Sequence, residues 1–341
     1  MSSDFQPILH RLAHGAALSA AETEAAFDLM MRGHATPAQI GGLLMAMRVR
    51  GETVDEITGA VRAMRAHMVP VAAPDDAIDT CGTGGDGART LNVSTAVAFV
   101  VAGCGVPVAK HGNRAVSSRS GAADVLEALG VNLEPPLETL SRAIHEARVG
   151  FLFAPRHHGA TRHVGPSRRE LGTRTLFNLL GPLANPAGAR RQLLGVFGAE
   201  WLAPLAEVLR ALGSERAWIV HGEDGLDELT TTTRSLVAEL RDGAITRFEV
   251  SPEQAGLPRA APEDLKGGDA RDNAAALRAL LRGKAGPYRD IVVLNAAAAL
   301  LVAGRAESLW HGAELARRSI DYGVAAARLD ALVRLTNEVY A

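Results

Sequence analysis

The chain has 341 residues, more than one hydrophobic core usually supports, so two domains, or one large domain with a helical appendage, are expected. Hydrophobic residues make up 47% and charged residues 22% of the sequence, which is ordinary globular usage and excludes a largely disordered chain. The 36 basic and 38 acidic residues give a net charge of -2, and no run of Lys or Arg is long enough for a nucleic-acid-binding tail. Any anion-binding site must therefore be local.

Both cysteines, Cys81 and Cys104, lie in segments rich in alanine, valine and glycine, which predicts buried thiols and no disulfide scaffold.

Residues 1–18 lack the basic stretch and apolar core of a secretion signal. The longest apolar run, residues 96–104, is far shorter than the roughly 20 residues of a membrane span. We therefore expect a cytoplasmic protein without a membrane-spanning segment.

Residues 1–70 carry three successive helix start signals, each a hydroxyl residue followed three positions later by Glu or Gln. The pairs are Ser19 with Glu22, Thr36 with Gln39, and Thr53 with Glu56. Pro70 and the residues after it end this helical block. We predict a helical domain over residues 1–73 and an α/β domain over residues 74–341, with part of residues 165–190 as a candidate to pack against the helical domain.

Beyond residue 74, short apolar strands alternate with helices, which is the pattern of an α/β fold. The predicted elements are strand 77–79, helix 94–102, strand 106–108, helix 120–129, strand 151–153, helix 167–180, strand 192–197, helix 201–212, strand 217–220 and strand 291–294. Asp242-Gly243 predicts a tight hairpin, and two helices are expected at the C-terminus.

A glycine-rich loop, residues 81–87, follows the first of these strands and precedes a helix that begins near residues 92–94. Glycines let backbone N–H groups approach an anion closely, and the helix N-terminus adds its positive end. The alternative is a tight connection that binds no ligand. The loop matches neither the Walker pattern nor the spacing of a dinucleotide-binding turn.

A second polar segment, residues 110–118, follows the next strand and concentrates cations, an amide and two hydroxyls. So many donors are costly to bury without an acceptor, and phosphate uses them well. A solvated polar loop is the alternative. Because the ends of neighbouring strands share one crevice in an open α/β sheet, the two loops together favour a phosphate site.

The two loops belong to a longer series of motifs, at residues 82–86, 92–95, 110–118, 120–130, 154–155 with His158, 168–172, 177–186 and 224–228. In this order they resemble the signature motifs of the anthranilate phosphoribosyltransferase family, and the resemblance covers essentially the whole chain. It implies a nucleoside phosphorylase-like phosphoribosyltransferase fold: a small N-terminal helical domain plus a larger α/β domain with a mixed, mostly parallel central sheet flanked by helices. It also implies transfer of ribose 5-phosphate from phosphoribosyl pyrophosphate (PRPP) to anthranilate, with Mg²⁺, in tryptophan biosynthesis, by a homodimer.

The resemblance also implies site residues. Those that match PRPP contacts are Gly82, Gly85, Asp86, Thr90, Asn92, Val93, Ser94, Thr95, Lys110, His111, Gly112, Asn113, Arg114, Ala115, Val116, Ser117, Ser118 and Ala122. Those that match anthranilate contacts are Gly82, Asn113, Arg168, His111 and His158, and those that match Mg²⁺ ligands are Ser94, Asp227 and Glu228. Two places depart from the family pattern, Ala122 and the stretch 159–161, which puts a phosphate contact and the substrate entrance in doubt.

Physical arguments support parts of this assignment. Hard oxygen ligands such as Asp227 and Glu228 suit Mg²⁺ that bridges to a pyrophosphate, although a lone acidic pair is more often a solvated turn. If Ser167 caps a helix, with Glu170 closing a capping box, Arg168 stands in the first turn, where its charge opposes the helix dipole and calls for an anion. A carboxylate would serve, and simple surface exposure is the alternative.

No residue is predicted as a certain catalytic group, and Lys110 and His111 are the candidates. The neutral amine of anthranilate is already a nucleophile, so charge stabilisation should contribute more than a general base. Three other functions stay open: a pyrimidine nucleoside phosphorylase, a transferase for another aromatic amine, and a non-catalytic paralogue that binds nucleic acid. The near-zero net charge argues against the last.

Overall fold

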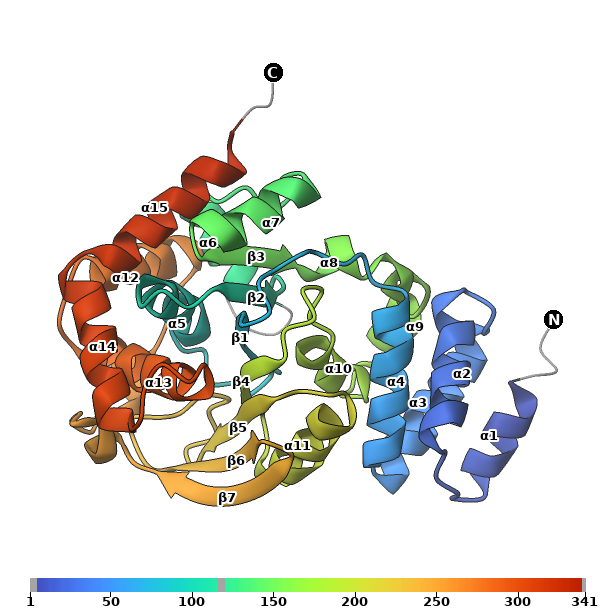
Figure 1. The fold of residues 1–341 in the computed structure, drawn as a ribbon. Coiled ribbons are helices and arrows are strands. Elements are labelled where there is room, and N and C mark those ends of the chain that lie inside the picture. The colour runs from blue at the N-terminus through green and yellow to red at the C-terminus, as the bar shows by residue number, and fades with distance from the viewer. Residues whose placement is uncertain (1–4, 116–119, 339–341) are drawn as a thin grey trace.

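A computed structural model describes residues 5–115 and 120–338. A small bundle of N-terminal helices lies beside a larger α/β unit (Figure 1). The bundle contains α1 (Gln6–Ala13), α2 (Ala20–Met31), α3 (Pro37–Arg50) and α4 (Val54–Ala66). The three predicted capping boxes are confirmed, since in α2, α3 and α4 the cap hydroxyl accepts from the third helical N–H and the Glu or Gln side chain accepts from the cap N–H.

The α/β unit is built on one seven-stranded sheet in the order β3-β2-β1-β4-β5-β6-β7. The strands are β1 (Ile78–Gly82), β2 (Val108–Gly112), β3 (Val149–Phe153), β4 (Arg191–Gly195), β5 (Arg216–Gly222), β6 (Ser235–Arg241) and β7 (Ala244–Val250). Strands β1 to β5 run parallel, and β6 and β7 pair antiparallel at one edge. The expected mixed, mostly parallel sheet is therefore confirmed, as is the hairpin at Asp242-Gly243, where both residues have positive φ.

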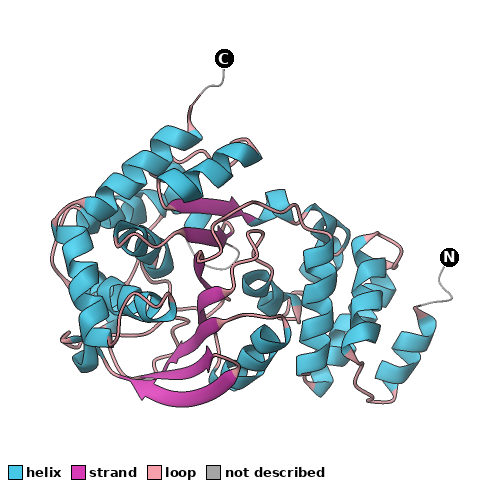
Figure 2. Cartoon of the chain, viewed as in Figure 1, coloured by secondary structure: helices cyan, strands magenta, loops and turns pink. Residues whose placement is uncertain are grey.

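Helices cover both faces of the sheet (Figure 2). The helices beyond the N-terminal bundle are α5 (Val93–Gly103), α6 (Ala122–Ala128), α7 (Leu137–Glu146), α8 (Ala154–His157), α9 (Gly165–Leu171), α10 (Phe177–Leu183), α11 (Leu202–Ala211), α12 (Ala270–Leu281), α13 (Pro287–Val302), α14 (Leu309–Asp321) and α15 (Val324–Thr336). Short 3-10 helices occupy Gly159–His163, Ala199–Trp201, Pro252–Ala255 and Pro262–Leu265. No helix in the described part of the chain has the length and apolar character needed to cross a membrane.

Two large apolar cores lie on the two faces of the sheet. One surrounds α5 and α13, both of which are buried along most of their length. The other joins α10 and α11 to the N-terminal helices α2, α3 and α4. Phe177 of α10 packs on Phe27 of α2, with ring centroids 5.4 Å apart. The helical bundle therefore shares a core with one face of the sheet, while the division at residue 73 stays a prediction.

Two predicted elements are wrong. Residues 291–294, predicted as a strand, lie inside α13, and a short apolar run of this kind cannot be assigned by periodicity alone because a buried helix shows the same pattern. The predicted helix 167–180 is two helices, because Gly172 takes a left-handed conformation with φ of 58° and ends α9. A smaller difference concerns β2, which runs to Gly112, so that Lys110 and His111 lie in a strand and not in the loop after it.

Candidate active site

The candidate site lies at the carboxyl ends of β1 and β4, where the strand order reverses. From β1 the chain continues to β2 on one side, and from β4 it continues to β5 on the other side, which opens a crevice between the two strand ends. The loop that carries Asp227 fits closely against both ends. A Cβ at Gly195 would lie 1.5 Å from the Asp227 carbonyl oxygen, and a Cβ at Gly82 would lie 2.4 Å from Oδ2 of Asp227. Both strands thus end in glycine because an acidic loop occupies the space.

Backbone amides hold the two predicted metal ligands in this crevice. The Gly84 N–H donates to Oδ2 of Asp227 at 2.7 Å, and the Ser94 N–H, in the first turn of α5, donates to Oε1 of Glu228 at 3.1 Å. Each carboxylate therefore meets one of the two predicted phosphate-binding features, the glycine-rich loop and the helix N-terminus. The structure brings Ser94 and Glu228 together beside Asp227, and their binding of Mg²⁺ stays a prediction.

The electrostatics of this acidic pair favour a cation. Burial raises the pKa of Asp227 well above its ordinary value, and the neighbouring charge of Glu228 raises it further. Burial also raises the pKa of Glu228, against the attraction of Lys110. No cluster of three or more His, Cys, Asp or Glu side chains is arranged for a metal within the described residues. An oxygen-preferring divalent ion would fit this pair and take its remaining ligands from a substrate, as Mg²⁺ commonly does.

The glycine-rich loop is open on its solvent side. Gly84, Gly85 and Gly87 have φ of 64°, 78° and 75°, values that a side chain would strain, and no heavy atom lies within 4 Å of a Cβ built at Gly84 or Gly87. A guanidinium from the opposite side, that of Arg174, hydrogen-bonds to the Gly85 carbonyl and stacks on Phe197 at 4.3 Å. The backbone can therefore approach an anion closely, with a cation nearby.

The end of this loop is anchored to a distant segment. Thr90 pairs with Lys266 in an isolated bridge, and the Leu91 N–H donates to the Leu265 carbonyl. The Asn92 side chain accepts from Asn273 at 2.9 Å, and the Asn92 carbonyl accepts from the Tyr288 hydroxyl at 3.0 Å. These contacts fix the start of α5. Two further predicted contacts, Val93 and Thr95, are themselves buried in α5.

Strand β2 presents its two polar residues to opposite faces of the sheet, because neighbouring side chains in a strand alternate. Lys110 points to the acidic side, where its ammonium donates to the Thr80 carbonyl and to the Ser94 hydroxyl, the latter at 3.2 Å. His111 points to the other face, where its Nδ1 lies 3.0 Å from the Gly181 carbonyl. The two catalytic candidates therefore serve different sides of the crevice.

His111 and His158 form a buried pair. Their Nε2 atoms lie 3.2 Å apart, and the side chains are 5% and 4% exposed. Because a carbonyl can only accept, the Gly181 contact assigns the His111 proton to Nδ1, and His158 then donates from Nε2 to His111. Burial lowers the pKa of His111 to about 3 and that of His158 to about 4. Both rings are neutral at ordinary pH, which suits contact with an aromatic ligand.

The structure places Arg168 differently from the sequence prediction. Helix α9 begins at Gly165 with Val164 as its cap, and Ser167 is buried within the helix, so the predicted cap and capping box are wrong. Arg168 therefore lies in the last turn, where its charge suits the helix dipole. Its guanidinium stacks on Phe177 at 4.9 Å, burial lowers its pKa, and no carboxylate of the described residues pairs with it. A partly desolvated cation without an acidic partner fits an anionic ligand.

The loop after β2 uses several of its predicted phosphate donors internally. Asp124 accepts from the Ala115 N–H at 3.0 Å and from the Gly121 N–H at 2.9 Å. Arg114 pairs with Asp124 and with Glu127 at the surface. The Asn113 side chain is exposed and accepts from the Arg114 N–H at 2.7 Å. Gly112 packs on Phe151, and Ala122 opens α6. Val116, Ser117 and Ser118 lie outside the described residues.

Several polar residues near the site were not predicted from the sequence. Asp79 is fully buried on β1 and bonds to Asn185, which belongs to the motif 177–186. The other missed residues are Arg174, Asn273 and Tyr288. An aspartate inside an apolar strand, such as Asp79, is a signal that could have been used, since buried charges are rare without a role. The contacts of Arg174, Asn273 and Tyr288 depend on the tertiary fold alone.

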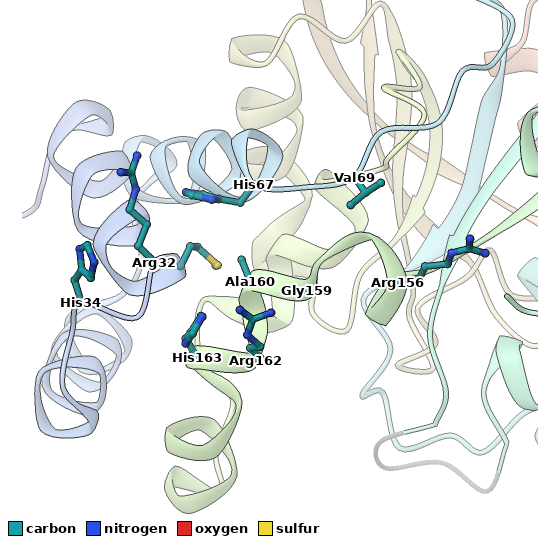
Figure 3. A pocket seen from close by; sticks show the side chains of 10 residues that line it. Arg32, His34, His67, Val69, Arg156, Gly159, Ala160, Arg162 and His163 are labelled. Atoms are coloured by element: carbon teal, nitrogen blue, oxygen red, sulfur yellow. The ribbon is translucent and has the colours of Figure 1, made fainter. Parts of the chain in front are cut away.

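A separate cleft of about 560 Å³ lies between the helical bundle and the segment that follows His158 (Figure 3). It is lined by Met31, Arg32, His34, His67, Val69, Arg156, Gly159, Ala160, Arg162 and His163. Asp28 neutralises part of this basic surface, because it pairs with both Arg32 and His67. Residues 159 and 160, at the second departure from the family pattern, thus border this cleft, and the predicted ligand contacts lie elsewhere.

Comparison with known proteins identifies relatives over the full length of the chain. Residues 6–68 match the helical bundle domain of a glycosyl transferase family, and residues 74–326 match the a/b domain of that family. The chain is 64% identical over 335 residues to the anthranilate phosphoribosyltransferase of Azospirillum brasilense, covering 98% of this chain and 94% of the relative. It is 61% identical over 333 residues to that of Rhodopseudomonas palustris strain TIE-1, covering 98% of each chain.

Solved structures agree with the sequence relatives. The anthranilate phosphoribosyltransferase of Thermus thermophilus superposes with a TM-score of 0.92 at 46% identity, covering 97% of this chain and 99% of that one. The enzyme from Saccharomyces cerevisiae in complex with PRPP and Mg superposes with a TM-score of 0.91 at 26% identity, covering 99% of both chains. With its fold, its crevice and these relatives in agreement, the chain belongs to the anthranilate phosphoribosyltransferase family.

Proposed function

We propose that this protein transfers the 5-phosphoribosyl group of PRPP to the amine of anthranilate, giving N-(5-phosphoribosyl)anthranilate and pyrophosphate, in tryptophan biosynthesis. The observation that carries the proposal is the acidic pair Asp227 and Glu228 at the strand switch point, bonded to the glycine-rich loop and to the N-terminus of α5. An anion-binding loop and a cation-binding pair on the same crevice are what a pyrophosphate-bearing substrate needs.

The residues divide the two substrates between the faces of the sheet. On the acidic face, the loop 82–87, Ser94 and Lys110 would hold the PRPP phosphates. On the opposite face, the neutral His111–His158 pair and the unpaired Arg168 would receive the ring and the carboxylate of anthranilate. Asn113, exposed directly after the end of β2, would contact both ligands. The amine of anthranilate then meets the anomeric carbon across the end of β2.

The main chemical demand is the departure of pyrophosphate. Mg²⁺ held by Asp227, Glu228 and Ser94 would supply charge stabilisation for that leaving group. Lys110, 3% exposed and fixed by Thr80 and Ser94, adds a positive charge that does not need to reorganise during the reaction. No residue needs to activate the amine, because neutral anthranilate already carries the reacting lone pair. We accordingly propose magnesium dependence and no obligatory general base.

Three further features belong to this proposal. The division into domains 1–73 and 74–341 is supported by the change from an all-helical bundle to an α/β unit. We also propose a homodimer formed through the helical domain, on the resemblance to the family, and a cytoplasmic location, where PRPP is available. Size-exclusion chromatography with light scattering tests the dimer, since a mass near 35.8 kDa would indicate a monomer.

The function is tested by offering the purified protein two reactions side by side. In the first, anthranilate, PRPP and Mg²⁺ should yield one pyrophosphate for each phosphoribosylated anthranilate. In the second, uridine or thymidine with inorganic phosphate should yield no free base. Release of base in the second reaction, with no product in the first, would replace the proposal by a pyrimidine nucleoside phosphorylase. Replacement of anthranilate by other aromatic amines in the first reaction tests the remaining rival transferase.

A further inference from the structure

A carboxylate that is not itself a predicted ligand contact is buried beneath the site, next to the backbone of His111. Asp79 in β1 is 0% exposed, and it points to the same face of the sheet as His111. Its Oδ1 accepts from the His111 backbone N–H at 3.1 Å, and its Oδ2 accepts from the Asn185 side-chain amide at 2.7 Å. A buried charge is costly to keep, so its hydrogen bonds must serve a purpose that an apolar residue could not.

Asn185 extends these contacts to the turn that ends α10. Its amide also donates to the Ala109 carbonyl at 2.8 Å, and its side-chain oxygen accepts from the Ala187 N–H at 2.8 Å. One amide group therefore joins β1, β2 and the turn. Nearby, Gln192 of β4 donates to the Pro182 carbonyl at 2.6 Å, which holds the same turn from a third strand. The segment from residue 181 to residue 185 is fixed to the sheet at two points.

The position of this segment determines the tautomer and the ring orientation of His111. The Gly181 carbonyl accepts from Nδ1 of His111, and this contact leaves Nε2 as the acceptor that faces His158. A shift of the turn by one bond length would break that hydrogen bond and free the ring to rotate or change tautomer. The backbone of His111 is held by Asp79 itself. Backbone and ring of the same histidine thus depend on one carboxylate.

We propose that Asp79 is a positioning residue, which, through Asn185 and the turn 181–185, orients the His111 ring for anthranilate on the face opposite to the metal pair. Lys110, on the neighbouring strand, supplies the compensating charge, and burial raises the pKa of Asp79. The kinetic part of this proposal rests on the proposed function, whereas the effect on the His111 ring does not.

Four variants test the proposal. Asp79→Asn sets an amide donor against the Asn185 amide while its oxygen still accepts from the His111 N–H, and Asn185→Leu, of similar size, removes both hydrogen-bonding groups of Asn185, so each breaks the Asp79–Asn185 bond. The double variant Asp79→Asn/Asn185→Leu closes a double-mutant cycle on this one bond. The control is Thr58→Val in α4, which removes a buried hydroxyl that bonds to the Val54 carbonyl outside the site. Kinetics for both substrates and ¹⁵N NMR of the histidine rings are measured, with His111→Gln used to assign the His111 signals.

Each single variant should raise the KM for anthranilate by about tenfold, leave the KM for PRPP within about twofold, and shift the His111 Nδ1 resonance. The double variant should raise the KM for anthranilate no further than the single variants do, because all three lose the same bond, and Thr58→Val should change neither the KM nor the resonance. A double variant whose KM rises by the product of the two single effects, or an unchanged His111 resonance in the single variants, would overturn the proposal. If Asp79→Asn does not fold, Asn185→Leu must by itself show the rise in KM and the shifted resonance.

Wild-type protein that does not consume anthranilate would defeat the proposed function instead. The NMR comparison of wild type and variants would still decide whether Asp79 positions the His111 ring.

Discussion

At the scale of single residues, the Arg168 guanidinium is the clearest indication of an anionic ligand. It stacks on the Phe177 ring and has no carboxylate partner among the described residues. We predict that Arg168→Ala raises the KM for anthranilate by about 10- to 100-fold, the loss expected for one charge-assisted hydrogen bond pair. Steady-state kinetics with each substrate varied in turn provide the measurement, and the KM for PRPP should change little.

The neighbouring Arg169 offers a matched control, because it is exposed on the same short helix. Arg169→Ala should leave both KM values near wild type. Equal losses for the two substrates in Arg168→Ala would show that the arginine supports the fold of the site and does not bind anthranilate.

His158 predicts a pH dependence of stability. Burial lowers its pKa from 6.5 to about 4, so the unfolded chain binds a proton below pH 6.5 that the folded chain refuses. Stability should therefore fall as the pH drops from 6.5 toward 4, and this one residue accounts for about 2 kcal/mol at pH 5. The variant His158→Gln, which can still donate to His111, should lose less stability than wild type between pH 7 and pH 5 in urea unfolding.

The exposed imidazole of His145 on α7 supplies the comparison. His145→Gln should follow the wild-type pH profile. If His158→Gln also follows it, the imidazole of His158 is not held neutral by burial.

At the level of helices and strands, two of the capping boxes differ in burial. They should therefore differ in their contribution to the free energy of unfolding. Glu56 is 0% exposed and accepts from the Thr53 N–H and from the Leu18 N–H, both at 3.0 Å, as well as from Arg50. Glu22 closes the box of α2 at the exposed surface. We predict that Glu56→Ala costs about 3 kcal/mol of unfolding free energy, since it leaves buried amides unpaired and the partly buried Arg50 without its carboxylate, and that Glu22→Ala costs about 1 kcal/mol or less.

Urea denaturation of the two variants measures this difference, with the m-value as a check on two-state behaviour. Similar losses would mean that Glu56 acts only as a local helix cap. A larger loss for Glu56→Ala would instead assign it to the connection between the start of α4 and the chain that leads into α2.

The closeness of the acidic loop to β4 gives a second prediction for an element. Gly195→Ala would place a Cβ 1.5 Å from the Asp227 carbonyl, so the loop must move away from the strand end. We expect a weaker response to Mg²⁺, seen as a rise in the Mg²⁺ concentration for half-maximal activity, together with a loss of about 1 to 3 kcal/mol in stability. Gly159→Ala, where nothing lies within 4 Å of the new Cβ, is the control. An unchanged Mg²⁺ response in Gly195→Ala would contradict the placement of Asp227.

At the scale of the whole molecule, the sequence predicts what is encoded locally and misses what depends on distant contacts. The capping boxes and the Asp242-Gly243 hairpin need only a few adjacent residues, and all are confirmed. The strand predicted at 291–294 fails because a continuous apolar run suits a buried strand and a buried helix equally. The predicted start of α9 fails because serine is a common helix cap, whereas the helix begins two residues earlier, at Gly165, with a proline in its first turn.

The candidate site also combines features that are visible locally in the sequence with contacts between distant residues. The loops 81–87 and 110–118 could be identified locally, since glycines and donors are visible in the sequence. Asp227 accepts from the Gly84 N–H, 143 positions away, because the chain places β4 on the side of β1 opposite to β2. The Asp79–Asn185 bond likewise joins residues 106 positions apart. The prediction of such contacts requires knowledge of the strand order, and a single sequence does not specify that order without a known relative.

Metal-assisted phosphoribosyl transfer at the Asp227–Glu228 pair can be measured by following anthranilate fluorescence with PRPP as Mg²⁺ is titrated. We compare wild type, Asp227→Asn/Glu228→Gln, and Glu223→Gln, an exposed acid in the same loop. Wild type and Glu223→Gln should lose fluorescence in a Mg²⁺-dependent manner, and the double variant should lose its response to Mg²⁺. Folded wild-type protein with no loss of fluorescence, or a double variant with the wild-type Mg²⁺ response, would contradict metal-assisted transfer at this pair.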